Sequence, residues 1–235
     1  MAHFSTLLPP DGQRILNVLA HPDDGESFTG GTMARLAQEG KEICYLVATR
    51  GEKGSDDRNM TPERLAAIRE EEQREAARLL GVQSVIFLEG YSDGCLEPSF
   101  KLREDLVRKI RELKPDVVFT FDPWKRYEIH PDHRAIGLCT IDAIACARGW
   151  MNYPEHIQEG LSEHRVKQVY LFNTDQPNHY IDIAPTLETK IAARCAHVSQ
   201  IRPSNHPSSY LTKWAEEAGK AAGYQYAEAF HSMAL

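Results

Sequence analysis

The sequence has little of what marks secreted and membrane proteins. Its five cysteines are an odd number, and none stands in a C-x-x-C pair, which argues against a disulfide framework and a structural zinc knot. No apolar run approaches the roughly 18 residues of a membrane helix, and the amino terminus lacks the basic and apolar segments of a signal peptide. We therefore expect a cytoplasmic protein with reduced thiols and without a membrane span.

Positive charge and phosphate-binding motifs are also scarce. The chain holds 27 Lys and Arg against 34 Asp and Glu, a formal net charge of -7, and no basic cluster stands out. This composition argues against nucleic acid as a partner. Neither glycine-rich phosphate motif, G-x-G-x-x-G or G-x-x-x-x-G-K-[ST], is present. We therefore interpret Gly30 and Gly31 as residues that let a helix pack tightly against a strand.

The composition that remains is typical of one globular domain. The chain has 235 residues, of which 42% are hydrophobic and 26% are charged, and these fractions exclude a disordered or fibrous chain. A single core is sufficient for a chain of this length, so we expect one domain over residues 1–235.

Short apolar runs alternate with helical patterns along the chain. Their length and β-branched content predict strands that are buried on both faces. We expect strands at 14–20, 42–48, 84–88, 116–121 and 166–172, and helices at 29–40, 61–80, 100–113 and after His130. The later part predicts a short strand at 180–183, a helix at 185–196 and a terminal helical region after Tyr210. This alternation predicts a Rossmann-like, doubly wound α/β fold, in which helices cover both faces of a mostly parallel sheet.

Two motifs rich in histidine and aspartate follow the first and fourth predicted strands. The first reads HPDD from His21 to Asp24, and the second reads HPDH from His130 to His133. In open α/β sheets, ligands bind outside the carboxyl ends of the strands, where the strand order reverses. A strand order of 3-2-1-4-5 makes the first and fourth strands neighbours, so we expect the two motifs to meet in space. One such motif could be a turn whose aspartate caps a helix, but two of them at strand ends favour a metal site.

The spacing within each motif suits a metal ion. Residues three positions apart share one face of a helical turn, so His21 and Asp24 can converge on one ion. His130 and His133 can do the same. A mixed imidazole and carboxylate set suits Zn²⁺, whose catalytic sites take three protein ligands and leave one position to water. The spacing leaves open whether His130 or His133 is the third ligand, or whether all four residues bind. Asp23, turned about 100° from Asp24 on a helical turn, can face that water as a general base.

Both motifs resemble those of a known family. AHPDDGE at 20–26 and HPDH at 130–133 are similar to the two motifs of the LmbE-like, or PIG-L, zinc-dependent N-acetylglucosaminyl deacetylases. Weaker similarities are ATRGEKG at 48–54, the R-x-x-E pattern that begins at Arg69, and GYSDG at 90–94. The resemblance extends over most of the chain. It implies a zinc-dependent hydrolase that removes the N-acetyl group from a small N-acetylglucosamine-containing substrate and releases acetate.

The resemblance also implies roles for individual residues. The implied residues are His21, Asp24 and His133 as zinc ligands; Asp23, His130 and Asp132 as catalytic groups; and Arg50 and Asp93 in the sugar pocket. Asp23 would act as the general base. His130 would stabilise the oxyanion and protonate the leaving amine, and Asp132 would orient or charge His130.

One position departs from the family pattern. Some members place a tyrosine two residues before the first histidine of the second motif, where it contacts the oxyanion. This chain has Glu128 there and carries Tyr127 one place earlier. The resemblance therefore does not imply that a tyrosine assists catalysis.

Two other functions fit the same residues. Histidines and carboxylates also build the two-metal sites of phosphoesterases, and a non-catalytic Rossmann-like binding module would use such side chains to cap its helices. The expected partner is a small-molecule amino-sugar conjugate. The resemblance leaves open the group attached to N-acetylglucosamine, the choice between Zn²⁺ and Fe²⁺, and the oligomeric state, although a homo-oligomer is common in the family.

Overall fold

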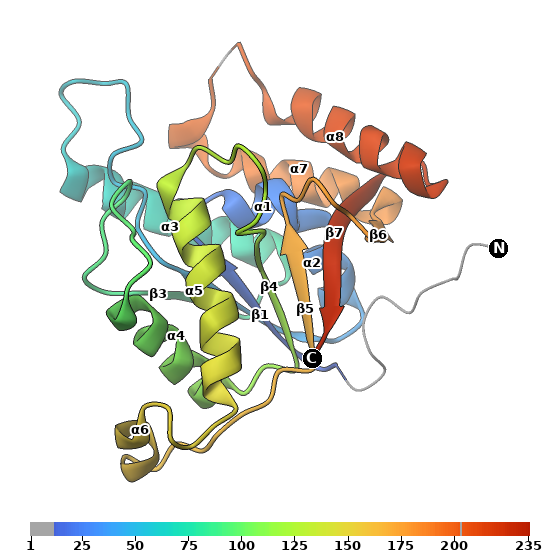
Figure 1. Cartoon of the computed structure of the whole chain (residues 1–235). Helices are drawn as coiled ribbons and strands as arrows, with labels where there is room; N and C mark the ends of the chain where they lie inside the picture. Colours follow the sequence, from blue (N-terminus) through green and yellow to red (C-terminus); the bar gives the residue numbers. More distant parts are fainter. Residues whose placement is uncertain (1–11, 203) are drawn as a thin grey trace.

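A seven-stranded sheet forms the centre of the molecule (Figure 1). The computed structural model describes residues 12–202 and 204–235. Residues 1–11, which belong to the amino-terminal stretch judged above for a signal-peptide pattern, lie outside the described residues. The strands are β1 Arg14–Leu19, β2 Glu42–Val47, β3 Ser84–Phe87, β4 Val117–Phe121, β5 Gln168–Phe172, β6 His179–Asp182 and β7 Ala227–Ala234. Five strands are parallel, in the order β3-β2-β1-β4-β5. The predicted strand order and the mostly parallel α/β fold are confirmed.

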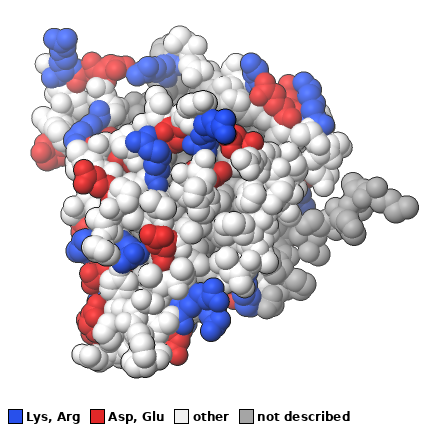
Figure 2. All heavy atoms as spheres, viewed as in Figure 1, with Lys and Arg blue, Asp and Glu red and all other residues white. Residues whose placement is uncertain are grey.

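Helices cover both faces of the sheet. They are α1 Asp24–Phe28, α2 Gly30–Gln38, α3 Pro62–Leu80, α4 Phe100–Leu113, α5 Pro131–Ala147, α6 Pro154–Gln158, α7 Leu187–Cys195 and α8 Pro207–Ala222, with short 3-10 turns at Ala184–Thr186 and Val198–Gln200. One layer contains α4 packed on α5, and the opposite layer contains α2, α3 and α7 packed together (Figure 1). Among the described helices, none combines the length and apolar character that a membrane span requires. Figure 2 shows Lys and Arg interspersed with Asp and Glu, without a broad patch of one sign on this face.

The boundaries of α3 follow from local sequence signals. The Thr61 hydroxyl accepts a hydrogen bond from the backbone N–H of Arg64, and Pro62 occupies the first helical position, where no intrahelical N–H is needed. The helix ends at Gly81, whose φ of 78° is the left-handed conformation that glycine adopts without strain. The predicted start and end of this helix are confirmed.

The first helical segment begins earlier than predicted. The sequence predicts a helix at 29–40, whereas the structure has α1 directly after β1 and then α2, with a break at Thr29. The Thr29 hydroxyl donates to the carbonyl of Gly25 at 2.9 Å and accepts from the Asn17 side chain at 2.8 Å, which holds the break in place. Because α1 starts at Asp24, the HPDD motif forms the turn that leads into a helix.

The carboxyl-terminal end also differs from the prediction. The expected terminal helical region corresponds to α8, which ends at Gly223, but the following segment forms β7, which the sequence did not predict. This strand pairs antiparallel with both β5 and β6, and Ala234 lies opposite Gln168 at the start of β5. Its side chains do not alternate strictly between apolar and polar residues, which is why periodicity missed it.

A buried ion pair attaches β7 to α2. The Glu228 carboxylate accepts hydrogen bonds from the backbone N–H groups of Gly31 at 2.9 Å and Thr32 at 2.8 Å, at the start of α2. It also lies 2.5 Å from the ammonium group of Lys190 in α7. Both charged side chains are 4% exposed. The close approach of Gly31 to this region, where a Cβ would come within 2.7 Å of Ile183, agrees with the predicted tight packing of the glycine pair.

Glu228→Gln tests this attachment. The substitution leaves the buried Lys190 without its counter-charge and weakens the bonds to α2, so we expect the free energy of unfolding to fall by about 3–5 kcal/mol. Urea unfolding followed by circular dichroism measures the loss. The control is Glu217→Gln, because Glu217 forms an ion pair with Lys213 on the exposed face of α8 and should change stability little. Equal, small effects of the two substitutions would contradict the role given to Glu228.

Candidate active site

The two histidine motifs lie at one edge of the sheet. β1 and β4 are adjacent and parallel, with Ile15 opposite Val117, so the chain leaves both strands at the same side. The ring centroids of His21 and His130 are 4.6 Å apart, those of His130 and His133 are 4.5 Å apart, and those of His21 and His133 are 5.3 Å apart. Parallel pairing therefore brings together residues that are more than 100 positions apart in the sequence.

Asp24 lies between two of these histidines. One carboxylate oxygen is 3.5 Å from Nδ1 of His21, and the other is 3.5 Å from Nε2 of His133. Backbone N–H groups of Ala20 and His21 donate to the first oxygen at 3.1 and 2.8 Å, which fixes the carboxylate at the end of β1. Ligand atoms that bind one Zn²⁺ tetrahedrally at about 2.0–2.1 Å lie roughly 3.3 Å from one another. The distance from each imidazole nitrogen to its nearer Asp24 oxygen, 3.5 Å, is close to this value.

One ring nitrogen of His133 and one of His130 lack a hydrogen-bond partner among the described residues. Within the described residues, Nδ1 of His130 and Nδ1 of His133 are buried atoms without a hydrogen bond. Buried polar atoms without partners are rare in folded proteins, and a metal ion, water or substrate satisfies them where they occur in a site. Nitrogen atoms of His21, His130 and His133 also lie within 4.8 Å of one another. This donor set is chemically suited to a divalent ion.

Asp132 takes a different position from the one implied. The family resemblance implies that it orients His130, but its hydrogen bonds among the described residues go to His21, Gly94 and Leu96. One oxygen is 2.9 Å from Nε2 of His21, and the fully buried carboxylate also accepts from the two backbone N–H groups. Asp132 is the second residue of α5, and His130 is the residue at the N-cap of this helix. Asp132 therefore orients His21.

Asp93 belongs to the same cluster. Its Oδ1 is 3.2 Å from Nε2 of His21, and its Oδ2 accepts from the backbone N–H of Lys53 at 3.1 Å. Burial raises the pKa of Asp93, but the hydrogen bond and charge of His21 outweigh it, and the pKa falls to about 2. Burial likewise opposes ionisation of Asp24, and the charges and hydrogen bonds of His133 and His21 hold its pKa well below the usual range.

His21 responds to these acids in the opposite sense. Burial alone would lower its pKa, but hydrogen bonds to Asp132, Asp24 and Asp93 outweigh burial and raise the pKa well above 6.5. Three carboxylates around one imidazole are a strongly cation-attracting environment. The raised pKa favours the protonated, positively charged form of His21.

The carboxylate of Asp23 lies beside two arginines. Its φ of 89° is the left-handed conformation, which aspartate tolerates better than most residues. Oδ2 of Asp23 lies 3.2 Å from Nη2 of Arg194 and 3.6 Å from Nη2 of Arg69. Gln73 accepts a hydrogen bond from the Asp23 backbone at 3.0 Å. The two adjacent carboxylates thus have different partners: Asp24 contacts histidines, and Asp23 contacts arginines.

Arg69 and Arg194 were not predicted as site residues. Arg69 is buried and donates to the carbonyls of Gly51 and Pro22, and Arg194 donates to the hydroxyl of Ser27 at 3.2 Å. The R-x-x-E pattern that begins at Arg69 was a signal that could have identified Arg69, and Arg194 lies within residues 190–200, which have only a weak similarity to the family. Arg50, which the resemblance placed in the sugar pocket, uses its guanidinium group instead to bind Glu70, Glu89 and the carbonyl of Leu88.

Glu128 faces the site, and Tyr127 does not. The side chain of Tyr127 projects into solvent from a residue that is 88% exposed. Oε1 of Glu128 lies 3.6 Å from Nδ1 of His133 and accepts from the backbone N–H of His130 at 3.0 Å. Its other oxygen accepts from the side chain of Asn173 at 2.8 Å. The residue that replaces the family tyrosine therefore lies beside a candidate metal ligand.

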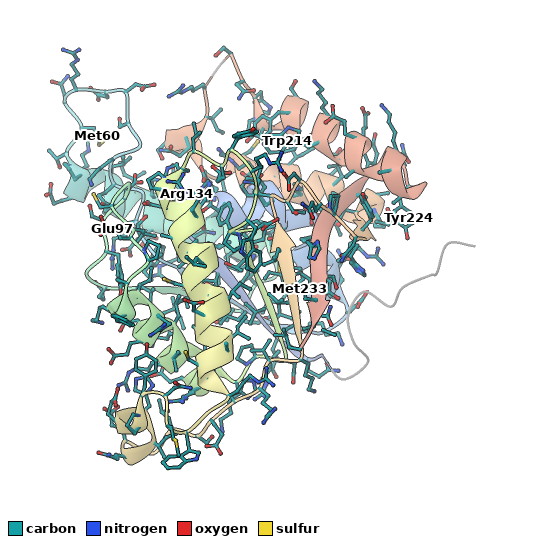
Figure 3. The ribbon with its side chains drawn as sticks, in the orientation of Figure 1. Met60, Glu97, Arg134, Trp214, Tyr224 and Met233 are labelled. Carbon is teal, nitrogen blue, oxygen red and sulfur yellow. The ribbon has the colours of Figure 1, made fainter. Side chains whose placement is uncertain are left out.

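A cavity of about 500 Å³ opens beside His133. We call it the Trp214 pocket; its walls include Ser27, Phe28, Glu128, His133, Asn173 and Trp214. Figure 3 labels Trp214, which lies where α8 approaches the loop that leads from β4 into α5. Pockets of roughly 300–1,000 Å³ hold small organic ligands. The metal-suited cluster therefore opens into a space large enough for a substrate.

Comparison with known proteins gives concordant matches. The family model described as PIG-L, GlcNAc-PI de-N-acetylase, matches residues 16–144. The chain is 34% identical over 221 residues to the diacetylchitobiose deacetylase of Thermococcus kodakarensis, which covers 93% of this chain and 82% of that protein. A second relative is a 1D-myo-inositol 2-acetamido-2-deoxy-alpha-D-glucopyranoside deacetylase of Kineococcus radiotolerans, which is 35% identical over 167 residues. This match covers 58% of this chain and 46% of that protein. The structure of an N,N'-diacetylchitobiose deacetylase from Pyrococcus horikoshii, complexed with its inhibitor MPG, superposes with a TM-score of 0.92 at 34% identity, covering 95% of this chain and 85% of that one.

The raised pKa of His21 predicts a pH dependence of stability in the protein freed of metal by a chelator. A group whose pKa is raised on folding stabilises the fold fully below its unfolded value, here 6.5, and this contribution is lost as the pH rises through the raised value. We expect the melting temperature of the metal-free protein to fall as the pH is raised above about 6.5. Scanning calorimetry across this range provides the measurement.

Asp132→Asn gives the matched comparison, because the hydrogen bond to Asp132 is the largest contribution that raises the pKa of His21. This variant should show a shallower fall of melting temperature with pH. The control is Asp142→Asn in the same helix, whose side chain is 48% exposed. A slope that is the same in all three proteins would disprove the coupling.

Proposed function

The chain belongs to the PIG-L family of GlcNAc-PI de-N-acetylases, and from this we propose that it is a metal-dependent hydrolase that removes the acetyl group from an N-acetylglucosamine unit of a small substrate. The products are acetate and the free amino sugar. The observation that carries the proposal is the meeting of HPDD and HPDH at one sheet edge, beside a cavity of about 500 Å³. Amide hydrolysis needs a water nucleophile, a base and a group that stabilises the oxyanion, and this edge offers candidates for each.

We assign zinc as the ion, with His21, Asp24 and His133 as its ligands. Nδ1 of His21 and Nε2 of His133 each face an oxygen of Asp24 at 3.5 Å, which supports these three residues as the ones that would hold the ion. An ion held there supplies a Lewis acid for the acetamide carbonyl and a water whose pKa falls to about 7. Asp132, hydrogen-bonded to Nε2 of His21, fixes the ring so that Nδ1 is free to bind, as carboxylates next to metal-ligating histidines do.

The remaining side chains perform the proton transfers. Asp23 takes the proton of the attacking water, and Arg194 and Arg69 hold its carboxylate in place at 3.2 and 3.6 Å. His130 lies 4.6 Å from His21 between ring centroids, at the start of α5, and stabilises the oxyanion of the tetrahedral intermediate. It then gives a proton to the leaving amine. Asp93 positions His21 from the second side and extends the cluster toward the loop at residues 90–94.

A phosphoesterase is the alternative that a specific observation favours. His21, Asp93 and Asp132 form a second group whose ligand atoms lie within 4.8 Å of one another, and two-metal enzymes hold their ions about 3.5–4 Å apart. However, that group uses Nε2 of His21, which already binds Asp132 at 2.9 Å. One ion per chain would support the deacetylase, whereas two ions and phosphate release would support the alternative.

The five cysteines are all free thiols, which supports our expectation of a reducing, cytoplasmic location.

Asp23→Asn separates catalysis from metal binding. The amide cannot take a proton from water, so we expect kcat for acetate release from diacetylchitobiose to fall by about 100- to 10,000-fold. The zinc content, measured by atomic emission, should stay at one ion per chain because Asp23 is not a ligand. Asp56→Asn, at a loop residue whose side chain is 83% exposed, is the control and should keep full activity. Loss of zinc from the Asp23 variant would show that the roles of the two adjacent aspartates are reversed.

His133→Ala and His130→Ala distinguish a ligand from a catalytic group. The first substitution removes one of three ligands, so we expect the zinc content to drop to near zero and the activity to disappear. The second leaves the three ligands in place, so zinc should be retained while kcat falls by about 100-fold or more. Equilibrium dialysis with zinc and acetate assays on the same samples measure both. The reverse pattern, with zinc lost only from the His130 variant, would exchange the assignments of the two histidines.

A further inference from the structure

Three polar side chains near the HPDD motif are completely buried and have no part in the proposed reaction. Glu26, Gln73 and His197 are each 0% exposed, and they come from α1, α3 and the turn that follows α7. Buried polar groups are costly unless they are hydrogen-bonded. None of the three lines the cavity beside His133, so they do not contact a substrate in that cavity.

The three side chains form a series of hydrogen bonds that ends at the backbone of Asp23. Nε2 of His197 lies 3.2 Å from Oε2 of Glu26. The other oxygen of Glu26 accepts from the side-chain amide of Gln73 at 2.9 Å, and the carbonyl oxygen of that amide accepts from the backbone N–H of Asp23 at 3.0 Å. A backbone N–H can only donate and a carboxylate can only accept, so an amide side chain is suited to join the two groups.

The backbone conformation of Asp23 needs support of this kind. Its φ of 89° and ψ of -15° lie in the left-handed region, where a residue other than glycine is held only if the surrounding structure fixes it. Asp23 is the N-cap of α1, and Glu26 is the third residue of that helix. In a capping box, a glutamate at this position binds the N–H of the N-cap residue directly. Here Gln73 accepts that hydrogen bond, and Glu26 binds Gln73 with one oxygen and His197 with the other.

The segment at the end of α7 binds Asp23 in two ways. Arg194, in the last turn of α7, lies 3.2 Å from Oδ2 of Asp23. His197, three residues later, reaches the backbone of Asp23 through the two side chains described above. This segment is in turn attached to α3, because the backbone N–H and the hydroxyl group of Ser199 both donate to Glu72 at 2.7 Å. The position of His197 relative to α3 is therefore well fixed.

We propose that His197 is a positioning residue for the general base, because it fixes the backbone of Asp23 through Glu26 and Gln73. This inference rests on the proposed function, in which Asp23 takes the proton of the attacking water. A displacement of a catalytic group by about 1 Å can lower a rate about 100-fold. Loss of the His197 hydrogen bond should therefore lower kcat and leave metal binding intact, since none of the three buried side chains is a proposed ligand.

The first test compares His197→Leu with His197→Gln in the zinc-loaded enzyme, with diacetylchitobiose as the substrate. Leucine cannot donate to Glu26, so we expect kcat to fall about 10- to 100-fold, while KM and the zinc content stay within about twofold of the wild-type values. Glutamine keeps an N–H donor and should restore most of kcat. His156→Leu is the matched control, because His156 is also 0% exposed but lies in α6, outside the candidate site, and should keep the wild-type kcat.

A double-mutant cycle distinguishes positioning of Asp23 from general support of the fold. Asp23→Asn already lacks the base, so the addition of His197→Leu should change its residual rate by less than about twofold. A residue that only stabilises the fold would lower the rate by the same factor in both backgrounds. Gln73→Met breaks the series of hydrogen bonds at its other end and provides the same cycle if the leucine variant of His197 does not fold.

The proposal is overturned if His197→Leu and Gln73→Met keep the wild-type kcat. It is also overturned if the loss of kcat is as large in the Asp23→Asn background as in the wild-type background. A zinc-loaded wild-type enzyme that releases no acetate would overturn the proposed function itself, and an Asp23→Asn variant with full activity would overturn the role of Asp23 as the base. Both of these results are distinct from equal losses in the two backgrounds.

Discussion

The carboxylate of Asp24, buried between His21 and His133, is the interaction on which the candidate site depends. A buried carboxylate is costly unless it is paired and hydrogen-bonded. Here two backbone N–H groups at the end of β1 bind one oxygen, and an imidazole nitrogen lies 3.5 Å from each oxygen. This arrangement exists only because β1 and β4 are neighbouring parallel strands. The order of the strands in the sheet is therefore also the condition for the chemistry of the site.

Acidic groups around His21 give the cluster its preference for a cation. Asp24 faces one ring nitrogen, and Asp132 and Asp93 face the other, so the imidazole sits among three carboxylates. A protonated histidine and a divalent ion are two ways to balance this charge, and they compete, because a ligating imidazole must be neutral. The same three acids that raise the pKa of His21 thus create an electrostatic environment that suits a metal ion.

The carboxyl-terminal third of the chain completes the site from the outside. Arg194 in α7 holds Asp23, Trp214 in α8 forms the outer wall of the pocket, and Glu228 in β7 anchors the start of α2. The family model matches residues 16–144 and so ends before all three. In the proposed function, residues of the shared motifs carry out the reaction, whereas residues outside them line part of the adjacent cavity. Substrate preference is thus expected to depend on the part of the chain that carries the weakest family signal.

Local signals in the sequence were sufficient to predict the parallel part of the sheet, the caps of α3 and the two histidine motifs. The reason is that apolar periodicity, helix caps and ligand spacing are properties of short segments. They were not sufficient for β7, whose pairing partners β5 and β6 lie far away in the chain, nor for the break at Thr29. Contacts between distant residues decided the rest. The buried Asp132 turned out to bind His21 and not its neighbour His130, the guanidinium group of Arg50 turned away to two glutamates, and Arg69 and Arg194 met at Asp23. Side-chain direction at a site depends on which segments pack over it, and this packing is set by the tertiary structure alone.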